Sequence, residues 1–344
     1  MDPFLPDSPS GTNGLSRAVR FYYRLKRFIP KRFRMALRKA HVSRVLASCQ
    51  DYWPINESAG AKPDGWPGWP KDRLFAFVLT HDVEGVLGVQ RTQKLAELEM
   101  EFGFRSSFNF VPEGEYRVPS ELRGWLTDRG FEVGVHDLHH DGTLYGSKSS
   151  FQQSARTINQ YIREWGAAGF RSGFMLHNLE WAHDLDVLYE ASTFDTDPFE
   201  PQPDGAHTIF PFWVAAPGNG NQSDPYGSRR EGYVELPYTL PQDSTVFIHL
   251  GHRSIDLWKR KLEWIASKGG MALVIVHPDY TSFDNHTVDK GEFPVALYRE
   301  FLSFVKEEYA SQYWHALPRD VASYCSQFKP MRSGDQSKVA GAAV

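Results

Sequence analysis

The sequence predicts an α/β fold in which a parallel β-sheet, open or closed into a barrel, alternates with helices. The first indication is segment 75–79 (FAFVL), which is apolar throughout, as expected for a parallel strand buried on both faces. The second is that six more short, β-rich segments follow it, most of them separated by helix-like segments. The third is size, because 344 residues with 41% hydrophobic composition can supply one large core.

The predicted elements can be placed in order along the chain. Strands are expected at 74–80, 105–111, 131–136, 169–173, 192–196, 245–250 and 271–277. Helices are expected at 88–102, 119–129, 148–165, 179–191, 254–268 and 294–310. The connection 200–243 is long and rich in Pro and Gly, with strand-like pieces at 209–215 and 233–238. Because so long a connection usually has a function, we interpret it as a lid that carries a hairpin beside the site.

The part of the chain before Lys71 has a composition of its own. Residues 1–15 are expected to be disordered, as is the tail 329–344. Residues 16–70 are interpreted as a basic helical arm followed by a Pro/Gly linker. Within this arm, residues 17–44 hold eleven Lys and Arg and no acid, interleaved with aromatic and aliphatic residues. Such an arm suits either an anionic membrane surface or the acidic remainder of the chain.

Neither a signal peptide nor a transmembrane segment is predicted. The first residues lack an apolar core region, and no run of ~18 apolar residues exists. Cys49 and Cys325 are too few for a disulfide framework, so nothing favours secretion. We therefore expect a cytoplasmic protein that is peripheral at the inner membrane if the basic arm binds lipid. The acidic remainder of the chain argues against a nucleic-acid partner.

Ionisable residues follow the predicted strands, each where a strand ends. In chain order they are Asp82, Glu84, His136, His140, Arg171, Asp195, Asp197 and His277. The carboxyl ends of parallel strands meet at one edge of the sheet, where α/β folds place their active sites. These side chains are therefore expected to lie close together.

Two of these residues have the spacing of metal ligands. His136 ends a strand, and one turn of chain brings His140 back beside it. Two imidazoles placed in this way can bind one divalent ion, and a carboxylate from a neighbouring strand would complete the set. Three protein ligands leave positions open for water and substrate, as a catalytic site requires. The alternative is a histidine-rich exposed turn without a metal.

The order Asp-x-Glu, His-x-x-x-His, Arg, Asp and His resembles the NodB-homology polysaccharide deacetylases, which are metal-dependent carbohydrate N- and O-deacetylases. The resemblance covers roughly Lys71–Gln327, and Thr80–Glu84 (THDVE) is similar to the first motif of that family. It implies a distorted parallel (β/α)7-type barrel over the catalytic domain 71–328, with the lid insertion and the basic arm outside its motifs.

The resemblance also implies the roles of the site residues. A divalent ion, with zinc as the first expectation, would be held by Glu84, His136 and His140. The catalytic groups would be Asp82 as the base, Arg171 holding that base, His277 as the general acid, and Asp195 or Asp197 orienting His277. The chain departs from the family in having Glu84 where Asp is usual and in having Ser-Gly, not Pro, after Arg171.

The expected function is hydrolysis of an acetyl or other acyl group from a sugar, a polysaccharide or a lipid-linked saccharide. One alternative is an amidase that acts on a C–N bond outside sugars. Another is a glycan-binding or assembly protein that keeps the fold without turnover.

Overall fold

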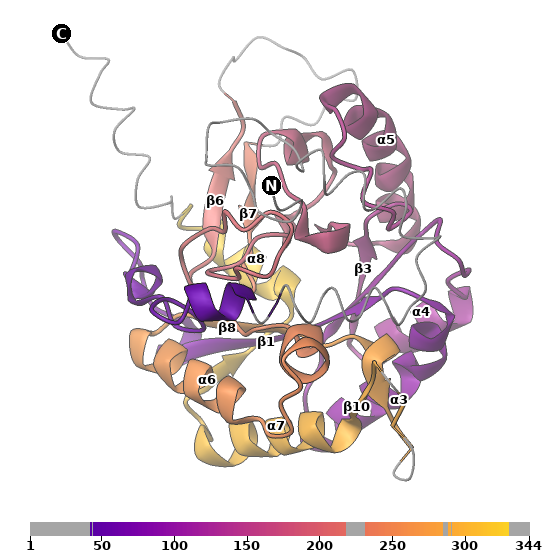
Figure 1. Ribbon diagram of the computed structural model, residues 1–344. Helices are drawn as coiled ribbons and strands as arrows, with labels where there is room; N and C mark the ends of the chain where they lie inside the picture. Colours follow the sequence, from indigo (N-terminus) through magenta and orange to yellow (C-terminus); the bar gives the residue numbers. More distant parts are fainter. Residues whose placement is uncertain (1–41, 43, 218–230, 285–287, 290, 330–344) are drawn as a thin grey trace, which may run out of the picture.

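The computed structural model describes residues 42, 44–217, 231–284, 288–289 and 291–329. The expectations for residues 1–15, for the basic arm up to residue 41 and for the tail from residue 330 lie outside these residues. The described chain is built on a nine-stranded sheet with the order β11-β1-β2-β3-β4-β5-β7-β6, in which β8 also pairs with β1 (Figure 1). All of its pairs are parallel except β6–β7.

The elements have the following bounds. The strands of the large sheet are β1 (Phe75–Val83), β2 (Ser107–Phe110), β3 (Glu132–His136), β4 (Gly169–Arg171), β5 (Tyr189–Glu190), β6 (Phe212–Ala215), β7 (Gly232–Glu235), β8 (Met271–Ile275) and β11 (Tyr313–His315). A small separate sheet pairs β9 (Thr281–Ser282) with β10 (Phe293–Pro294). The longer helices are α3 (Val86–Phe102), α4 (Ser120–Asp128), α5 (Lys148–Trp165), α6 (Asp256–Lys268), α7 (Val295–Glu308) and α8 (Pro318–Cys325).

Strand β1 pairs with three strands, β2, β8 and β11, and all nine of its residues are buried. Its side chains alternate between two cores, as the period of a strand requires. Phe75, Phe77 and Leu79 pack in the outer core, which includes side chains of the surrounding helices. Ala76 and Val78 pack in the inner core with side chains from β8 and β7. The prediction of a strand buried on both faces is confirmed.

The sheet curls until the chain after β7 reaches β8. The backbone N–H groups of Thr239 and Leu240 both donate to the carbonyl oxygen of Leu273, each at 3.1 Å. The hydroxyl of Thr239 also donates to the carbonyl oxygen of Met271 at 2.6 Å. These bonds link the last part of the curled sheet to β8, so the predicted α/β barrel-type fold is confirmed.

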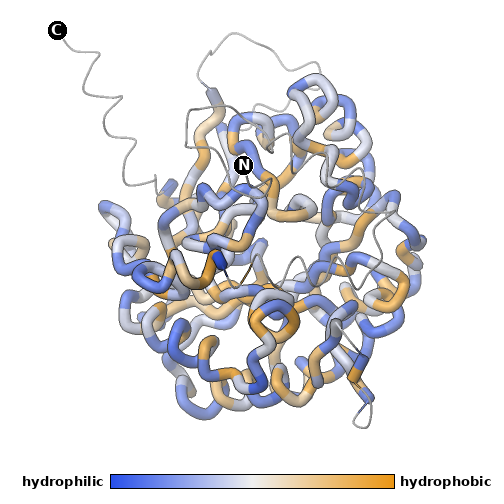
Figure 2. The backbone as a smooth tube through the Cα atoms, viewed as in Figure 1, coloured by the Kyte–Doolittle hydropathy of each residue, from blue (hydrophilic) through white to orange (hydrophobic). Residues whose placement is uncertain are grey.

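Helices cover the outside of the sheet, and along them hydrophobic and hydrophilic residues alternate in short stretches (Figure 2). In α5 the buried residues are Phe151, Ala155, Ile158 and Ile162, which lie on one helical face. The hydroxyl of Ser147 caps its first turn, and Gly166, with φ 64°, ends it. Within the described ranges, every helix is too short or too polar to span a lipid bilayer.

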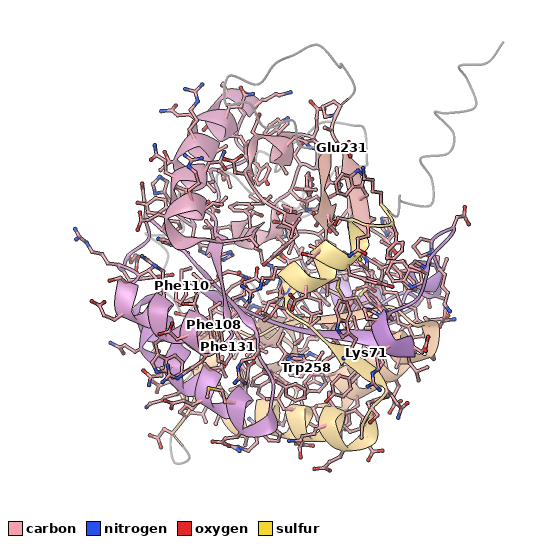
Figure 3. The ribbon with its side chains drawn as sticks, turned by 180° about the vertical axis from the view of Figure 1, so that it is seen from behind. Lys71, Phe108, Phe110, Phe131, Glu231 and Trp258 are labelled. Carbon is pink, nitrogen blue, oxygen red and sulfur yellow. The ribbon has the colours of Figure 1, made fainter. Side chains whose placement is uncertain are left out.

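Aromatic side chains fill much of the outer core. Phe108 on β2 lies close to Phe131, the residue before β3 (Figure 3), and their ring centroids are 5.8 Å apart. Trp258 of α6 is fully buried, and its Nε1 donates to the carbonyl oxygen of Pro241 at 2.7 Å. Burial of each such ring contributes about 1.5–3 kcal/mol, so this layer supplies much of the folding free energy.

Three sequence predictions about secondary structure are wrong. Segment 245–250 is not a strand but part of a π-helical segment, Ser244–His249. Segment 179–191 is not a helix: it contains the 3-10 turn Trp181–Asp184 and then β5. Segment 192–196 contributes only an isolated bridge. Short apolar segments fit either periodicity, so their pattern alone does not separate a strand from a helical turn.

The long connection 200–243 has the predicted hairpin, because β6 and β7 pair antiparallel. Strand β7 also pairs in parallel with β5 and so is a strand of the main sheet, which the sequence analysis did not predict. The sequence analysis did not predict β11 or α8, which follow α7. Strand β11 pairs in parallel with β1, and α8 comes directly after it.

Candidate metal and active site

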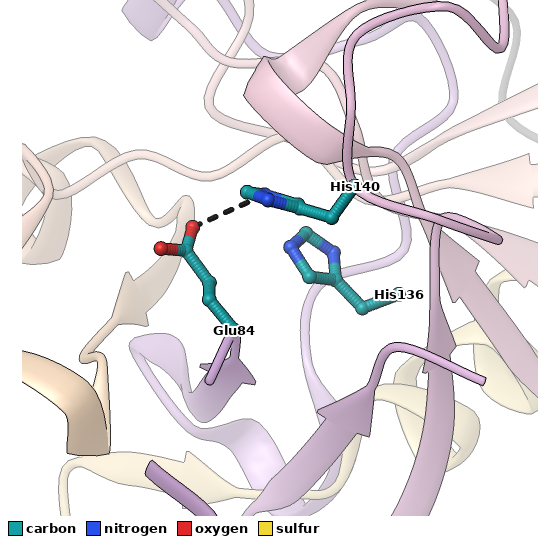
Figure 4. A group of neighbouring side chains, drawn as sticks. All are labelled: Glu84, His136 and His140. Carbon is teal, nitrogen blue, oxygen red and sulfur yellow. Dashed lines mark ion pairs between the residues drawn. The ribbon is translucent and has the colours of Figure 1, made fainter. Parts of the chain in front are cut away.

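The three predicted metal ligands converge at the carboxyl end of the sheet. Glu84 directly follows β1, His136 is the last residue of β3, and His140 lies on the turn after it. One potential ligand atom from each lies within 4.8 Å of the other two. Figure 4 shows the Glu84 carboxylate facing the two imidazoles, with Oε1 at 3.2 Å from Nε2 of His140.

The turn between the two histidines is tight. Asp137 and His140 both have positive φ, at 57° and 54°, a region that few residues other than glycine adopt. The Asp137 carboxylate accepts hydrogen bonds from the N–H groups of Leu138, at 2.6 Å, and Gly173, at 3.1 Å. Asp137 therefore holds the loop in place, and the strain of the turn is offset by these bonds.

His136 has the protonation pattern of a metal ligand. Its Nδ1 lies 3.1 Å from the carbonyl oxygen of Arg171, which can only accept, so Nδ1 carries the proton and Nε2 a free lone pair. Nε2 is buried and has no hydrogen-bond partner among the described residues. Burial also lowers the pKa of His136, so the neutral form is favoured. An unpartnered lone pair between a carboxylate and a second imidazole fits a divalent ion.

The carboxylate of Glu84 is ionised, and one of its oxygens accepts a hydrogen bond. Burial raises its pKa, but the neighbouring charges of His140 and His277 outweigh burial and bring the pKa well below its usual value. Its Oε2 accepts a hydrogen bond from the hydroxyl of Tyr280 at 2.6 Å. A charged oxygen is therefore available to a cation.

Asp82, the predicted base, lies on β1 two residues before Glu84. One of its oxygens accepts from Nη1 of Arg171, at 3.1 Å, and from Nδ2 of Asn109, at 2.9 Å. Burial raises the pKa of Asp82, but the positive charge of Arg171 overcomes this effect, and the pKa falls to about 2. The structure thus places Arg171 against Asp82, as expected, and Asn109 is a contact that sequence reasoning missed.

His277 is held by Asp243, which the sequence analysis did not single out. Oδ1 of Asp243 lies 2.6 Å from Nδ1 of His277, and Oδ2 accepts the backbone N–H of His277 at 2.7 Å. Nε2 of His277 faces Oε1 of Glu84 at 3.8 Å, so the ring points into the site. Burial lowers the pKa of His277, but the Asp243 carboxylate raises it to about 10 overall. The ring therefore carries a proton at neutral pH.

The expectation that Asp195 or Asp197 orients His277 is corrected by these contacts. Oδ2 of Asp195 pairs instead with Nζ of Lys261 at 2.5 Å, and both side chains are buried. Oδ2 of Asp197 accepts from the hydroxyl of Tyr238 at 2.8 Å. Burial raises the pKa of each aspartate to about 6. Lys261 is a residue of α6, so Asp195 is paired with a helix and not with His277.

A comparison with sequence families found no matching family, and none of the curated proteins matched either. Among solved structures, a provisionally named polysaccharide deacetylase from Mycobacterium smegmatis matches with a TM-score of 0.57 and 16% sequence identity, over 79% of this chain and 96% of that chain. The Xyl-CE4 domain of a multidomain xylanase from the hindgut metagenome of Trinervitermes trinervoides matches with a TM-score of 0.41 and 9% identity, over 75% and 95% of the two chains.

A CE4 family pseudoenzyme from Bacillus anthracis matches with a TM-score of 0.41 and 12% identity, over 72% of this chain and 65% of that chain. Of these three structures, the one from Mycobacterium smegmatis is similar enough to support a conclusion, and at its level of identity that conclusion concerns the fold. This chain has the α/β barrel fold of a polysaccharide deacetylase.

Proposed function

We propose that this chain is a metal-dependent hydrolase that removes an acyl group, first of all an N-acetyl group, from a sugar or glycan intermediate. The observation that carries the proposal is the buried, unpartnered Nε2 of His136, which faces the ligand atoms of Glu84 and His140. The likeness in fold to a polysaccharide deacetylase supports it. Zinc is proposed among divalent ions because two imidazoles and one carboxylate suit it.

The arrangement gives each side chain a chemical task. Glu84, His136 and His140 would hold a divalent ion, which would supply Lewis acidity and lower the pKa of bound water from ~15.7 toward 7. Asp82 takes the proton of the attacking water, and the charge of Arg171 beside it keeps it ionised between turnovers.

His277 acts at the end of the reaction. Since Asp243 holds Nδ1, the opposite nitrogen Nε2 is the one that points into the site, and it donates a proton to the leaving amine or hydroxyl. Asp243 fixes both the ring orientation and its positive charge. The acid and the base thus lie on two adjacent segments, after β8 and on β1.

Metal analysis of the purified protein, combined with an acetate-release screen over nucleotide sugars, lipid-linked sugars and polymers, tests the proposal. We expect bound metal and release from at least one substrate. The matched variant is Asp82→Asn, which keeps the shape and should keep the metal while turnover falls by roughly 10²- to 10⁴-fold. Absence of metal would overturn the proposal. Metal without turnover on any substrate would favour a glycan-binding protein, and near-normal turnover in Asp82→Asn would assign the base elsewhere.

We also propose that lipid-linked saccharides are substrates met at an anionic membrane surface. The support is the composition of residues 17–44, in which eleven cations are interleaved with apolar residues. Sedimentation with vesicles should require anionic lipid, weaken with salt, and disappear when residues 1–41 are removed. Binding that is insensitive to salt, or none at all, would refute this part and leave the hydrolase assignment standing.

A further inference from the structure

Two residues shortly after His277 contact Glu84 from across the site. The segment Pro278–Tyr280 forms a single 3-10 turn that begins at His277. Tyr280 donates its hydroxyl to Oε2 of Glu84 at 2.6 Å, and Asp279 accepts the backbone N–H of Glu84 through Oδ2 at 2.9 Å. One glutamate is therefore held at both its backbone and its side chain by neighbouring residues of another segment.

Asp279 also fixes the start of helix α3. Its Oδ1 accepts the N–H of Gly88 at 3.1 Å, and the N-cap residue of α3, Gly85, has no side chain that could do so. A Cβ at Gly88 would lie 2.1 Å from Oδ2 of Asp279, so only glycine leaves room for this contact. The backbone around Glu84 is therefore anchored between the end of β1 and the first turn of α3.

Tyr280 contacts the Glu84 carboxylate at a position that the shorter side chain of an aspartate would not reach. The glutamate side chain has one more methylene than aspartate, and with it more rotamers and a choice of either oxygen toward a cation. The hydroxyl of Tyr280 occupies Oε2, while Oε1 faces Nε2 of His140 at 3.2 Å and Nε2 of His277 at 3.8 Å. Oε1 is therefore the oxygen of Glu84 that is directed toward the imidazoles of His140 and His277.

We propose that Asp279 and Tyr280 are positioning residues that make Glu84 a ligand through one oxygen, Asp279 by fixing its backbone and Tyr280 by holding Oε2. The inference rests on the proposed function, because it concerns the same metal ligand. It accounts for how a glutamate serves at a position where the similar family uses aspartate. Asp279 and Tyr280 lie on the turn Pro278–Tyr280, which directly follows the acid His277. The metal ligand Glu84 and the acid are therefore held at a fixed separation.

The first test measures Zn²⁺ affinity of the metal-free full-length chain by competition with a chelating dye. Tyr280→Phe removes one hydroxyl and should weaken Zn²⁺ binding by about 10- to 100-fold, the usual effect of losing such an outer contact. The control is Tyr324→Phe, which removes a hydroxyl bonded to the carbonyl oxygen of Gly68, far from the ligands in the sequence and in the fold. It should bind Zn²⁺ as the wild type does, and a cooperative urea unfolding transition in both metal-free variants shows that each remains folded.

A double-mutant cycle tests whether Tyr280 acts through the length of Glu84. Glu84→Asp withdraws the carboxylate by about 1.5 Å, beyond hydrogen-bond reach of Tyr280. In that background Tyr280→Phe should change Zn²⁺ affinity by less than about threefold, because the contact is already lost. Equal losses in both backgrounds, or equal affinity of Tyr280→Phe and the wild type, would overturn the inference alone. Failure of the wild type to bind any divalent ion would overturn the proposed function as well.

Discussion

The contact between Asp243 and His277 allows a quantitative prediction. Asp243 is fully buried, and its two oxygens accept the ring Nδ1–H of His277 at 2.6 Å and the backbone N–H of His277 at 2.7 Å. Asp243→Asn keeps the size but removes the charge and one acceptor. A hydrogen bond to a charged group contributes about 1.5–3 kcal/mol. Since about 1.36 kcal/mol corresponds to a factor of ten in rate, turnover should fall by roughly 10- to 200-fold.

The assay is acetate release at saturating substrate, measured across pH on protein of known metal content. The Asp243 carboxylate raises the pKa of His277 to about 10 against the opposing effect of burial, so His277 stays protonated into the alkaline range. Without that charge the pKa falls, and the alkaline limb of the rate profile should move to lower pH. Metal content should not change.

The matched control is Asp197→Asn. Asp197 is also a buried aspartate, but it contacts Tyr238 and not His277. It should keep turnover and the alkaline limb. If Asp243→Asn retains turnover within about threefold of the wild type with an unmoved alkaline limb, His277 is not held by Asp243 in the way argued. If instead Asp197→Asn shows the larger loss, the original expectation from the sequence is restored.

Three further predictions concern the metal, the buried ion pair and pH. His136→Ala should lose stoichiometric metal in elemental analysis, whereas His139→Ala, whose side chain is 47% exposed, should retain it; full occupancy in His136→Ala would refute the ligand assignment. Lys261→Met should lower the free energy of unfolding by about 3–5 kcal/mol in urea titrations, because Asp195 would stay buried without its partner, and a change below 1 kcal/mol would contradict this. Burial raises the pKa of Glu132 to about 7, so the folded state retains a proton that the unfolded state releases. This contribution to the free energy of unfolding should be full below about pH 4.5 and lost as the pH approaches 7. Glu132→Gln should remove this pH dependence of the free energy of unfolding.

Local signals explain which parts of the fold could be predicted. The bounds of α5 agree with the prediction because a serine cap, an apolar stripe and a terminal glycine all act within Ser147–Gly166. Strand β5 was missed because it has only two residues, and its place is set by pairing with β4 and β7. Segment 245–250 has the composition of a strand, but Asp243 caps a helical turn at Ser244 and thereby decides its structure.

The same distinction applies to the site. Glu84 and His136 could be brought together from the sequence, because each follows a strand of one parallel sheet and such ends share an edge. Asp243 could not, since it lies on a connection after β7 that no periodicity places. Asp279 and Tyr280 contact a residue about 195 positions earlier, and only the pairing of β1 with β8 sets that distance in space.

The position of β1 has a consequence for how the protein is made. Its neighbours in the sheet include β2, which follows soon after, but also β8 and β11, which are synthesised roughly 200 residues later. Until β8 has left the ribosome, β1 has one edge without its native partner, and unpaired edges invite association between chains. Contacts so distant along the chain also slow folding. A chain that stops before β8 should therefore emerge insoluble unless a chaperone shields β1, and Glu84 can be held in place only after Asp279 and Tyr280 have been synthesised.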